Sequence, residues 1–144
     1  MQRLKEIQIK GRELKLPVFF PDATRGVIRS LDSRDIVDTG THGLVTNTYH
    51  LLSQPGPSVL GELGGIKPFM NWNGWIITDS GGFQVFSLIH KNPSLGSITE
   101  DGVTFHLHSK GGRKKYTITP EQCIQIQFEL NPDIMICLDY FTPF

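Results

Sequence analysis

The sequence has few cysteines, no net charge and no long hydrophobic run. Two of its 144 residues are cysteine, Cys123 and Cys137, and they are too far apart for a CxxC motif, so we predict two reduced core cysteines. Fourteen Lys and Arg balance fourteen Asp and Glu, and the overall charge indicates neither a nucleic-acid nor a membrane partner. No segment approaches the ~20 apolar residues of a membrane span, and the start, MQRLKEIQIK, lacks the apolar core of a signal peptide. We expect a cytoplasmic protein with no membrane partner.

Metal-binding motifs are also missing from the sequence. The five histidines are dispersed, and although His106 and His108 would share one face of a strand, no third ligand lies near them. We predict a surface strand at this position and no metal site. With 38% hydrophobic and 19% charged residues, the chain has the composition of one globular domain.

Apolar runs alternate with helix signals along the chain. We predict strands over 14–21, 43–47, 75–79 and 134–139, and helices over 30–40, over 58–70 with a break at two glycines, and over 119–130. Thr119, Pro120 and Gln122 form the start signal of the last helix, with a capping box. Period-two alternation over 98–118 predicts a small antiparallel β excursion. The alternation indicates parallel βαβ units and an α/β fold, either an open sheet or a (β/α)8 barrel.

Three predicted strands end in a polar residue. These residues are Asn47, Asp79 and Asp139. Each strand could simply end where polarity begins, but ligands bind at the carboxyl ends of parallel strands, and the coincidence of three such ends favours a site.

The stretch ITDSGGFQVFS, 77–87, suits a flat polar ligand. A second carboxylate and partial burial would raise the pKa of Asp79 toward values useful for proton transfer. Two glycines after Ser80 would let a ligand approach the backbone. Phe83 offers an aromatic face for stacking, and Gln84 offers a donor and an acceptor. The alternative is an ordinary Gly-Gly turn with Phe83 in the core.

One cluster of basic residues stands out in the predicted excursion. The segment KGGRKKY, 110–116, contains Arg113, Lys114 and Lys115. These side chains are candidate contacts for RNA phosphates. The alternative is a solvated hairpin surface.

Several long segments carry a family resemblance. PVFFPDATRG, NTYHLL, GGIKPFMNW, TDSGGFQVFSL, DGVTFHLH and DIMICLD resemble, in this order along the chain, the amino-terminal half of the tRNA-guanine transglycosylase (queuine tRNA-ribosyltransferase) family, in its bacterial and eukaryotic form. The resemblance implies a TIM barrel that exchanges the anticodon wobble guanine of tRNA for a 7-deazaguanine base, a pentosyltransferase reaction of queuosine biosynthesis.

The resemblance also implies roles for individual residues. Asp79 matches the aspartate assigned to proton transfer at the base, with Ser80 beside it. Asp139 matches the aspartate that binds the guanine edge, and Phe83 matches the aromatic residue that stacks on the base. The other two matches are Asn47, near the reacting ribose, and Gln84, close to the base.

The chain departs from the family pattern after Asp139. Tyr140 and Phe141 stand where the family has a small or polar pair, which alters the base pocket. Residues 1–144 would supply about half of a ~250-residue barrel, so we expect the nucleophilic aspartate and the zinc subdomain to lie outside them. An isolated chain would then be inactive and would need a complementary carboxyl-terminal chain or a homologous subunit. The alternative is a non-catalytic partner subunit or a degenerate remnant of the family.

Overall fold

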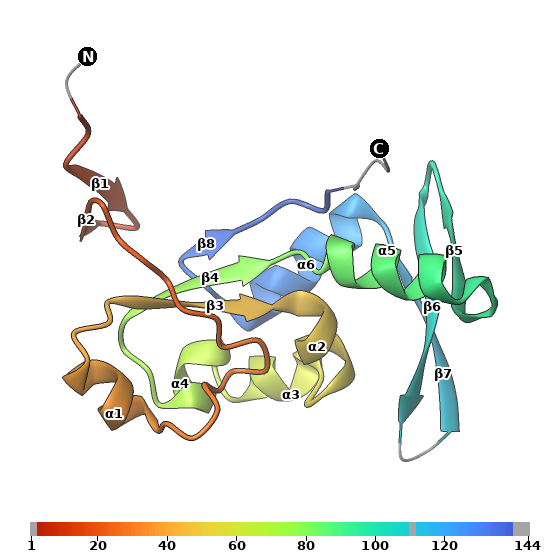
Figure 1. Ribbon diagram of the computed structural model, residues 1–144, viewed down its shortest axis with the longest axis horizontal. Helices are drawn as coiled ribbons and strands as arrows, with labels where there is room; N and C mark the ends of the chain where they lie inside the picture. Colours follow the sequence, from red (N-terminus) through yellow and green to blue (C-terminus); the bar gives the residue numbers. More distant parts are fainter. Residues whose placement is uncertain (1–2, 110–111, 140–144) are drawn as a thin grey trace.

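Three parallel strands form the centre of the fold in a computed structural model that describes residues 3–109 and 112–139 (Figure 1). Strands β3 (Gly43–Asn47), β4 (Trp75–Asp79) and β8 (Ile134–Met135) lie in the order β3-β4-β8. The predicted bounds of the first two strands are confirmed. The strand predicted over 134–139 is shorter, because its pairing with β4 covers two residues before the chain turns away. The order confirms an α/β fold with neighbouring parallel strands, as in the first part of a (β/α)8 barrel.

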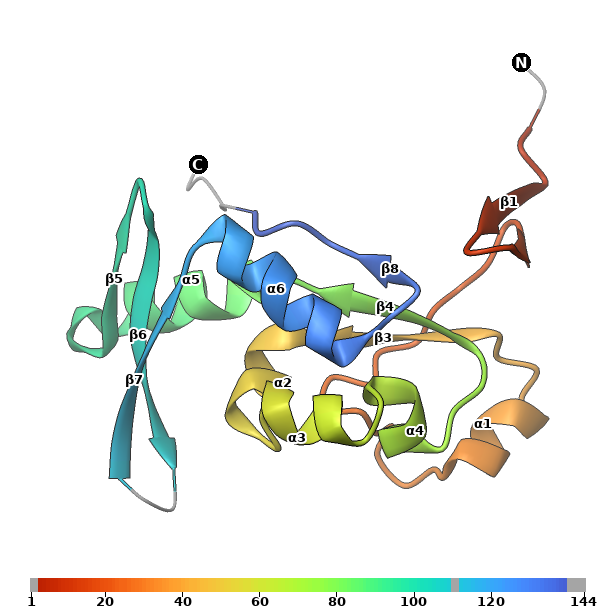
Figure 2. The same ribbon diagram turned by 180° about the vertical axis from the view of Figure 1, so that it is seen from behind.

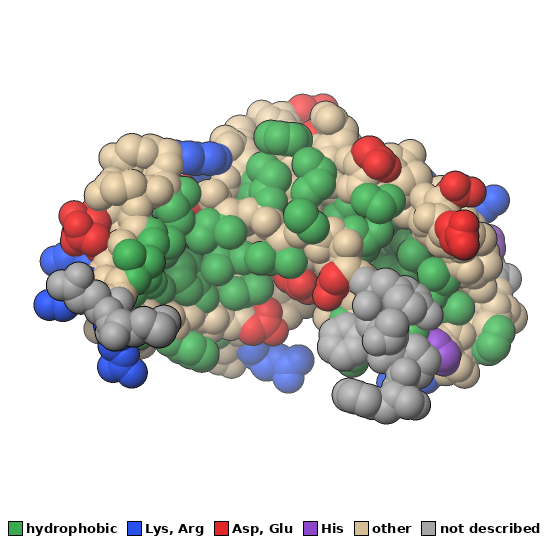
Figure 3. Space-filling view, turned by 90° about the horizontal axis from the view of Figure 1, so that it is seen from above, with side chains coloured by type: hydrophobic (Ala, Val, Ile, Leu, Met, Phe, Trp, Pro, Cys, Tyr) green, Lys and Arg blue, Asp and Glu red, His purple; other side chains and the backbone are tan. Residues whose placement is uncertain are grey.

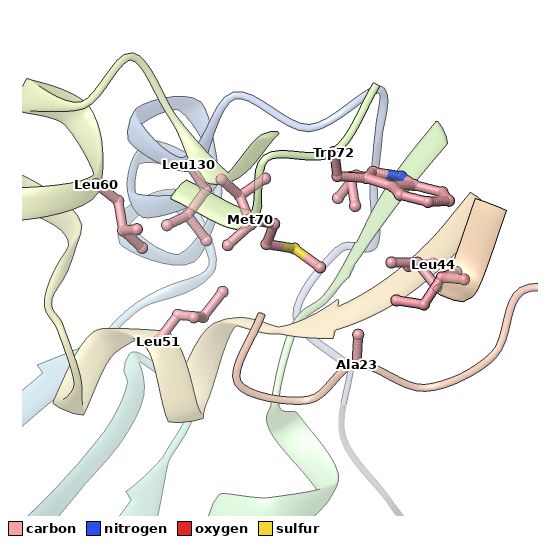
Figure 4. Packing of buried hydrophobic residues seen from close by; sticks show 10 residues of the cluster. Ala23, Leu44, Leu51, Leu60, Met70, Trp72 and Leu130 are labelled. Carbon is pink, nitrogen blue, oxygen red and sulfur yellow. The ribbon is translucent and has the colours of Figure 1, made fainter. Parts of the chain in front are cut away.

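Short helices cover one face of this sheet. They are α2 (Thr48–Ser53), α3 (Pro57–Glu62), α4 (Ile66–Met70) and α6 (Pro120–Leu130), and Figure 2 shows α6 lying beside α3. Leu44 and Ile76 point from the sheet into a core that these helices complete with Leu51, Leu60 and Leu130 (Figure 4). Burial of such side chains stabilises the fold by roughly 1.5–3 kcal/mol each.

Helix boundaries follow the predicted signals where a cap is present. Helix α1 (Ser33–Asp38) is shorter than the predicted 30–40 because Asp32 caps it with a capping box. The predicted capping box of α6 at Thr119 is confirmed. The predicted break between α3 and α4 is also confirmed, since Gly65 has a φ of +110° and a Cβ there would lie 2.8 Å from the Leu130 carbonyl oxygen.

The amino-terminal segment differs from the prediction. It forms a hairpin of β1 (Glu6–Ile9) and β2 (Arg12–Lys15), so the strand predicted over 14–21 is wrong beyond Lys15. Prolines at 17 and 21 lack the N–H group that a ladder needs. Backbone hydrogen bonds instead join Pro21 and Ala23 to Val45 of β3.

An antiparallel sheet stands beside the parallel one and confirms the predicted excursion. It consists of β5 (Gly96–Thr99), β6 (Gly102–Ser109) and β7 (Gly112–Ile118), and it is reached through α5 (Gly82–Lys91) and a 3-10 turn, η1 (Pro93–Leu95). Phe105 and Ile118 pack with Tyr49, Val85 and Cys123 in a second core.

The two cysteines have different environments. Both are free, but Cys123 is buried and Cys137 is exposed, so the prediction of two core cysteines is wrong for Cys137. Cys137 follows the short β8, where the chain has left the sheet.

The face of the parallel sheet opposite the helices is apolar. Val45 and Ile77 are only half buried, and Ile136 is exposed. Figure 3 shows apolar side chains gathered on this side of the molecule. Within the described residues, no helix has the length and apolar character required to cross a membrane.

Candidate active site

The carboxyl ends of β3 and β4 bring two of the predicted site residues together. The parallel register places Asn47 opposite Asp79. The Asn47 Nδ2 group donates a hydrogen bond to Asp79 Oδ2 at 2.5 Å. Asn47 is nearly fully buried and also caps α2, so the amide that orients Asp79 is itself held in place.

Asp139 reaches the same place from the segment after β8. The Ser80 hydroxyl donates to Asp139 Oδ1 at 2.9 Å, across 59 positions of sequence. Ser80 is buried and its oxygen also accepts from the Gly82 N–H. The structure therefore brings Asn47, Asp79, Ser80 and Asp139 to one edge of the sheet.

The environment of Asp79 makes its charged form less favourable than that of an exposed aspartate. Burial raises the pKa of Asp79 above its ordinary value, and the neighbouring Asp139 carboxylate raises it further. Hydrogen bonds from the Gly81 and Ser80 amides and from Asn47 act in the opposite direction without cancelling the rise in pKa. The predicted direction of the shift is confirmed, and this carboxyl group can carry a proton closer to neutral pH than an exposed aspartate can.

The two glycines allow other parts of the chain to pack closely against the sheet edge. Gly81 has a φ of +80°, and a Cβ there would lie 2.5 Å from the Cβ atom of Tyr49. A Cβ at Gly82 would lie 2.5 Å from the backbone oxygen of Asp139. Tyr49 and Asp139 therefore pack closely against the two glycines, and the approach of a ligand to the glycine backbone stays a prediction.

Phe83 and Gln84 lie in the first turn of α5. Phe83 is 51% exposed, so the alternative that places it in the core is wrong. Gln84 is half buried, and its Oε1 atom is buried without a hydrogen-bond partner among the described residues. Whether either residue contacts a base stays a prediction.

A mostly apolar cavity of about 550 Å³ opens next to this edge. Ser80, Gly81, Gly82 and Asp139 line it on one side, and side chains of α5 and of the antiparallel sheet line the other. Asp79, Asn47, Phe83 and Gln84 are not part of its lining. The site is therefore an open edge of the sheet with a cavity beside it, not a single enclosed pocket.

Strand register divides the predicted basic cluster. Lys114 pairs with Leu107, and Lys115 pairs with His106 one step along the ladder. Since side chains alternate across a strand, Lys114 and Lys115 belong to opposite faces of β7. Lys114 lies over the Tyr116 ring at 5.2 Å. Arg113 pairs with His108 in the same ladder, and the side chains of these two residues lie outside the described part of the structure, as does the predicted common face of His106 and His108.

Two further predictions concern metals and the residues after Asp139. Within residues 3–109 and 112–139, no group of three or more His, Cys, Asp and Glu side chains could hold a metal ion, and a zinc site does not fit the two cysteines. The predicted change of pocket shape at Tyr140 and Phe141 lies outside the described residues.

Two residues escaped the sequence analysis. Tyr49 packs its backbone against Gly81, and no local pattern marks that contact. Gln127 is fully buried under the site and bonds Thr78. The sequence pattern could have indicated Gln127, because Cys123, Gln127 and Leu130 follow the spacing of a buried helix face. A polar residue on such a face needs hydrogen-bond partners.

Parallel strands with paired carboxylates at their carboxyl ends define an α/β protein of the kind that binds ligands at strand ends. The family described as "Queuine tRNA-ribosyltransferase" matches residues 1–144. The chain is 45% identical over 132 residues to the queuine tRNA-ribosyltransferase of Solidesulfovibrio magneticus, covering 92% of this chain and 34% of that protein. The corresponding protein of Rickettsia prowazekii is 44% identical, with 92% and 35% covered, and that of Methylobacillus flagellatus is 45% identical, with 96% and 36% covered.

The chain belongs to the queuine tRNA-ribosyltransferase family. It spans about a third of the length of the curated relatives that it matches.

Proposed function

We propose that this chain forms the base-binding part of a cytoplasmic tRNA-modifying pentosyltransferase, which exchanges the anticodon wobble guanine for a 7-deazaguanine base in queuosine biosynthesis. The observation that carries the proposal is the position of Asp79 and Asp139 at one sheet edge, where Asn47 donates to Asp79 and Ser80, the next residue after Asp79, donates to Asp139. In this proposal, the Asp139 carboxylate accepts hydrogen bonds from the ring N–H and the exocyclic amine of the base. Phe83 stacks on the base, and Gln84 binds its periphery.

Asp79 carries the proton in the proposed exchange. A carboxylate nucleophile attacks C1′ of the ribose, the N-glycosidic bond breaks, and its electron pair leaves with guanine, which then takes up a proton. The incoming base loses its N9 proton before it displaces the enzyme from C1′. A carboxyl group with a raised pKa suits both transfers, and a positioned acid or base of this kind contributes roughly 10²- to 10⁴-fold in rate. Asn47 holds Asp79 beside the ribose.

The nucleophile and the zinc subdomain are proposed to lie in the two thirds of the family's length that this chain does not span. Together with that part, the proposed substrates are tRNA and the free base. Lys115 and Arg113 are proposed tRNA contacts, and Lys114 is a weaker candidate because it lies over Tyr116. The second candidate is a non-catalytic partner subunit or a remnant of the family that keeps the base site.

Guanine exchange tests the proposal. The chain is incubated with unmodified substrate tRNA and labelled guanine, alone and together with the carboxyl-terminal part of a relative. We expect incorporation only in the second arm, reduced at least 10²-fold by Asp79→Asn and unaffected by Asp38→Asn at the exposed end of α1.

The other outcomes of this experiment discriminate between the candidates. Incorporation by the chain alone would mean that a nucleophile lies within the 144 residues. A folded complex that binds labelled guanine and incorporates none would favour the non-catalytic partner. A complex that neither binds nor incorporates guanine would refute both candidates.

A further inference from the structure

The side chain of Gln127 joins three parts of the protein beneath the candidate site. Its Oε1 atom accepts from Thr78 Oγ1 at 2.5 Å, and its Nε2 group donates to the Ile136 carbonyl at 3.0 Å. Nε2 also lies 3.4 Å from both the carbonyl oxygen and the Sγ atom of Cys123. Gln127 has no exposed surface, so every polar atom of its amide depends on these partners.

Each of these partners lies close to a site residue, either in sequence or in space. Thr78 directly precedes Asp79, and Ile136 starts the segment that ends at Asp139. Cys123 Sγ approaches the Ser80 carbonyl oxygen at 3.8 Å. The amide of Gln127 therefore spans the gap between the strand that carries one carboxylate and the segment that carries the other.

Strand pairing alone does not fix this gap. The ladder between β4 and β8 covers Ile77 with Ile134 and Thr78 with Met135. After Met135, one backbone hydrogen bond remains, from the Ile136 N–H to the Thr78 oxygen at 2.9 Å. Gln127 holds the other side of the same peptide segment, at the last point where both chains run together.

We propose that Gln127 is a positioning residue that sets the separation of the Asp79 and Asp139 carboxylates. The side chain at position 127 must offer both an acceptor and a donor, because the Thr78 hydroxyl donates a hydrogen bond to it and the Ile136 carbonyl accepts one from it. An apolar side chain of similar size would leave two buried polar groups without partners. The segment 136–139 would then move away from β4 to regain water, and it would take Asp139 with it.

The test compares Gln127→Leu with Thr46→Val. Thr46 is a matched control, because it is fully buried in the neighbouring strand and its hydroxyl bonds a backbone carbonyl, that of Ile77. Carboxyl groups of aspartate are labelled with ¹³C and titrated by NMR, with Asp79→Asn used for assignment. Binding of labelled guanine is measured by equilibrium dialysis on the same samples.

The expected result is a change at Asp79 that the control does not show. The titratable group that acts on the pKa of Asp79 is Asp139, and Asp79 and Asp139 both act on the buried Cys123 thiol. With Asp139 displaced and water admitted, the titration midpoint of Asp79 moves down toward the value of an exposed aspartate. The affinity for guanine falls about tenfold, and Thr46→Val leaves both quantities unchanged.

A second variant keeps the proposal testable if Gln127→Leu does not fold. Thr78→Val removes the bond to Gln127 from the other side with little change of shape, and it should lower the Asp79 midpoint in the same direction. Folded variants with an unchanged midpoint would overturn the proposal. The expected loss of guanine affinity rests on the proposed function, whereas the titration midpoint of Asp79 does not. A shifted midpoint in a protein that binds no guanine would therefore refute the proposed function and support the positioning role of Gln127.

Discussion

The parallel sheet and the antiparallel sheet distribute their polar side chains in different ways. In β3 and β4, polar residues gather at the carboxyl ends, where Asn47 and Asp79 face each other. In β6 and β7, polar residues alternate along the whole ladder, with Thr104 opposite Thr117 and His106 opposite Lys115. The first arrangement concentrates charge in a partly buried place that shifts a pKa, and the second spreads charge over a surface. Proton transfer needs the first arrangement, and contact with a long polyanion is better served by the second.

The largest difference between the two regions should come from glycine substitution. Gly81→Ala must adopt a φ of +80° and places a Cβ 2.5 Å from that of Tyr49, whereas Gly112 has a φ of +107° and open space around it. A left-handed residue costs roughly 1–2 kcal/mol in either place, and overpacking adds about 1–3 kcal/mol at Gly81 alone. Urea denaturation measures the loss of unfolding free energy in Gly81→Ala and in Gly112→Ala. Equal losses would mean that Tyr49 yields without cost and that the sheet edge is not tightly built.

The next largest difference between the two regions is expected in the pH dependence of stability. A raised folded-state pKa means that the native state binds more protons than the unfolded chain, so the contribution of Asp79 to stability is full below the ordinary aspartate pKa and is lost as the pH rises through the raised value. In Asp79→Asn this side chain no longer titrates, so the loss of stability with rising pH is absent. The variant should therefore gain in melting temperature relative to the wild type as the pH increases from about 4 to neutrality.

Glu121→Gln is the matched control for this experiment. Side-chain hydrogen bonding by Thr119 lowers the pKa of Glu121, which is fully exposed, so its contribution has the opposite sign and is present at neutral pH. A melting-temperature difference between Asp79→Asn and the wild type that does not vary with pH would contradict the environment described for Asp79.

The smallest effects are expected on the surface of the antiparallel sheet. Lys115→Glu should weaken binding of substrate tRNA and reduce its salt slope by about one. Lys114→Glu belongs to the other face and loses a contact with Tyr116 worth roughly 0.5–1 kcal/mol, so it should lower stability slightly and change the salt slope less. Filter binding at several salt concentrations measures both. Identical slopes would show that the two faces of β7 contribute alike.

Local patterns predicted the parts of the fold that depend on neighbouring residues. The apolar runs of β3 and β4 and the capping box at Thr119 are local signals, and the structure has these elements as predicted. Helix α5 escaped prediction because Gly81 precedes it and no side chain caps it. Helix α2 escaped because Asn47 ends a strand and caps the helix at once.

The site could be predicted as a set of residues but not as a geometry. Strand ends and a family resemblance named Asp79 and Asp139. The hydrogen bond that joins Ser80 to Asp139 spans 59 positions, and no periodicity in a sequence encodes such a contact. The same limit applies to Gly81 and Gly82, whose neighbours in space are Tyr49 and Asp139.

Asp133, whose side chain is 7% exposed, lies at the other end of the segment that carries Asp139. Asp133 accepts from the Ile76 N–H at 2.8 Å and pairs with Lys67 at 2.6 Å and with Arg12 of the amino-terminal hairpin at 3.5 Å. The stretch 134–138 is thus tethered at both ends, by Asp133 to the start of β4 and by Asp139 to Ser80. Because both ends of this stretch are held, the sequence must keep its number of residues. Insertion or deletion of one residue there would break either the contacts of Asp133 or the hydrogen bond between Ser80 and Asp139, whatever side chain is inserted.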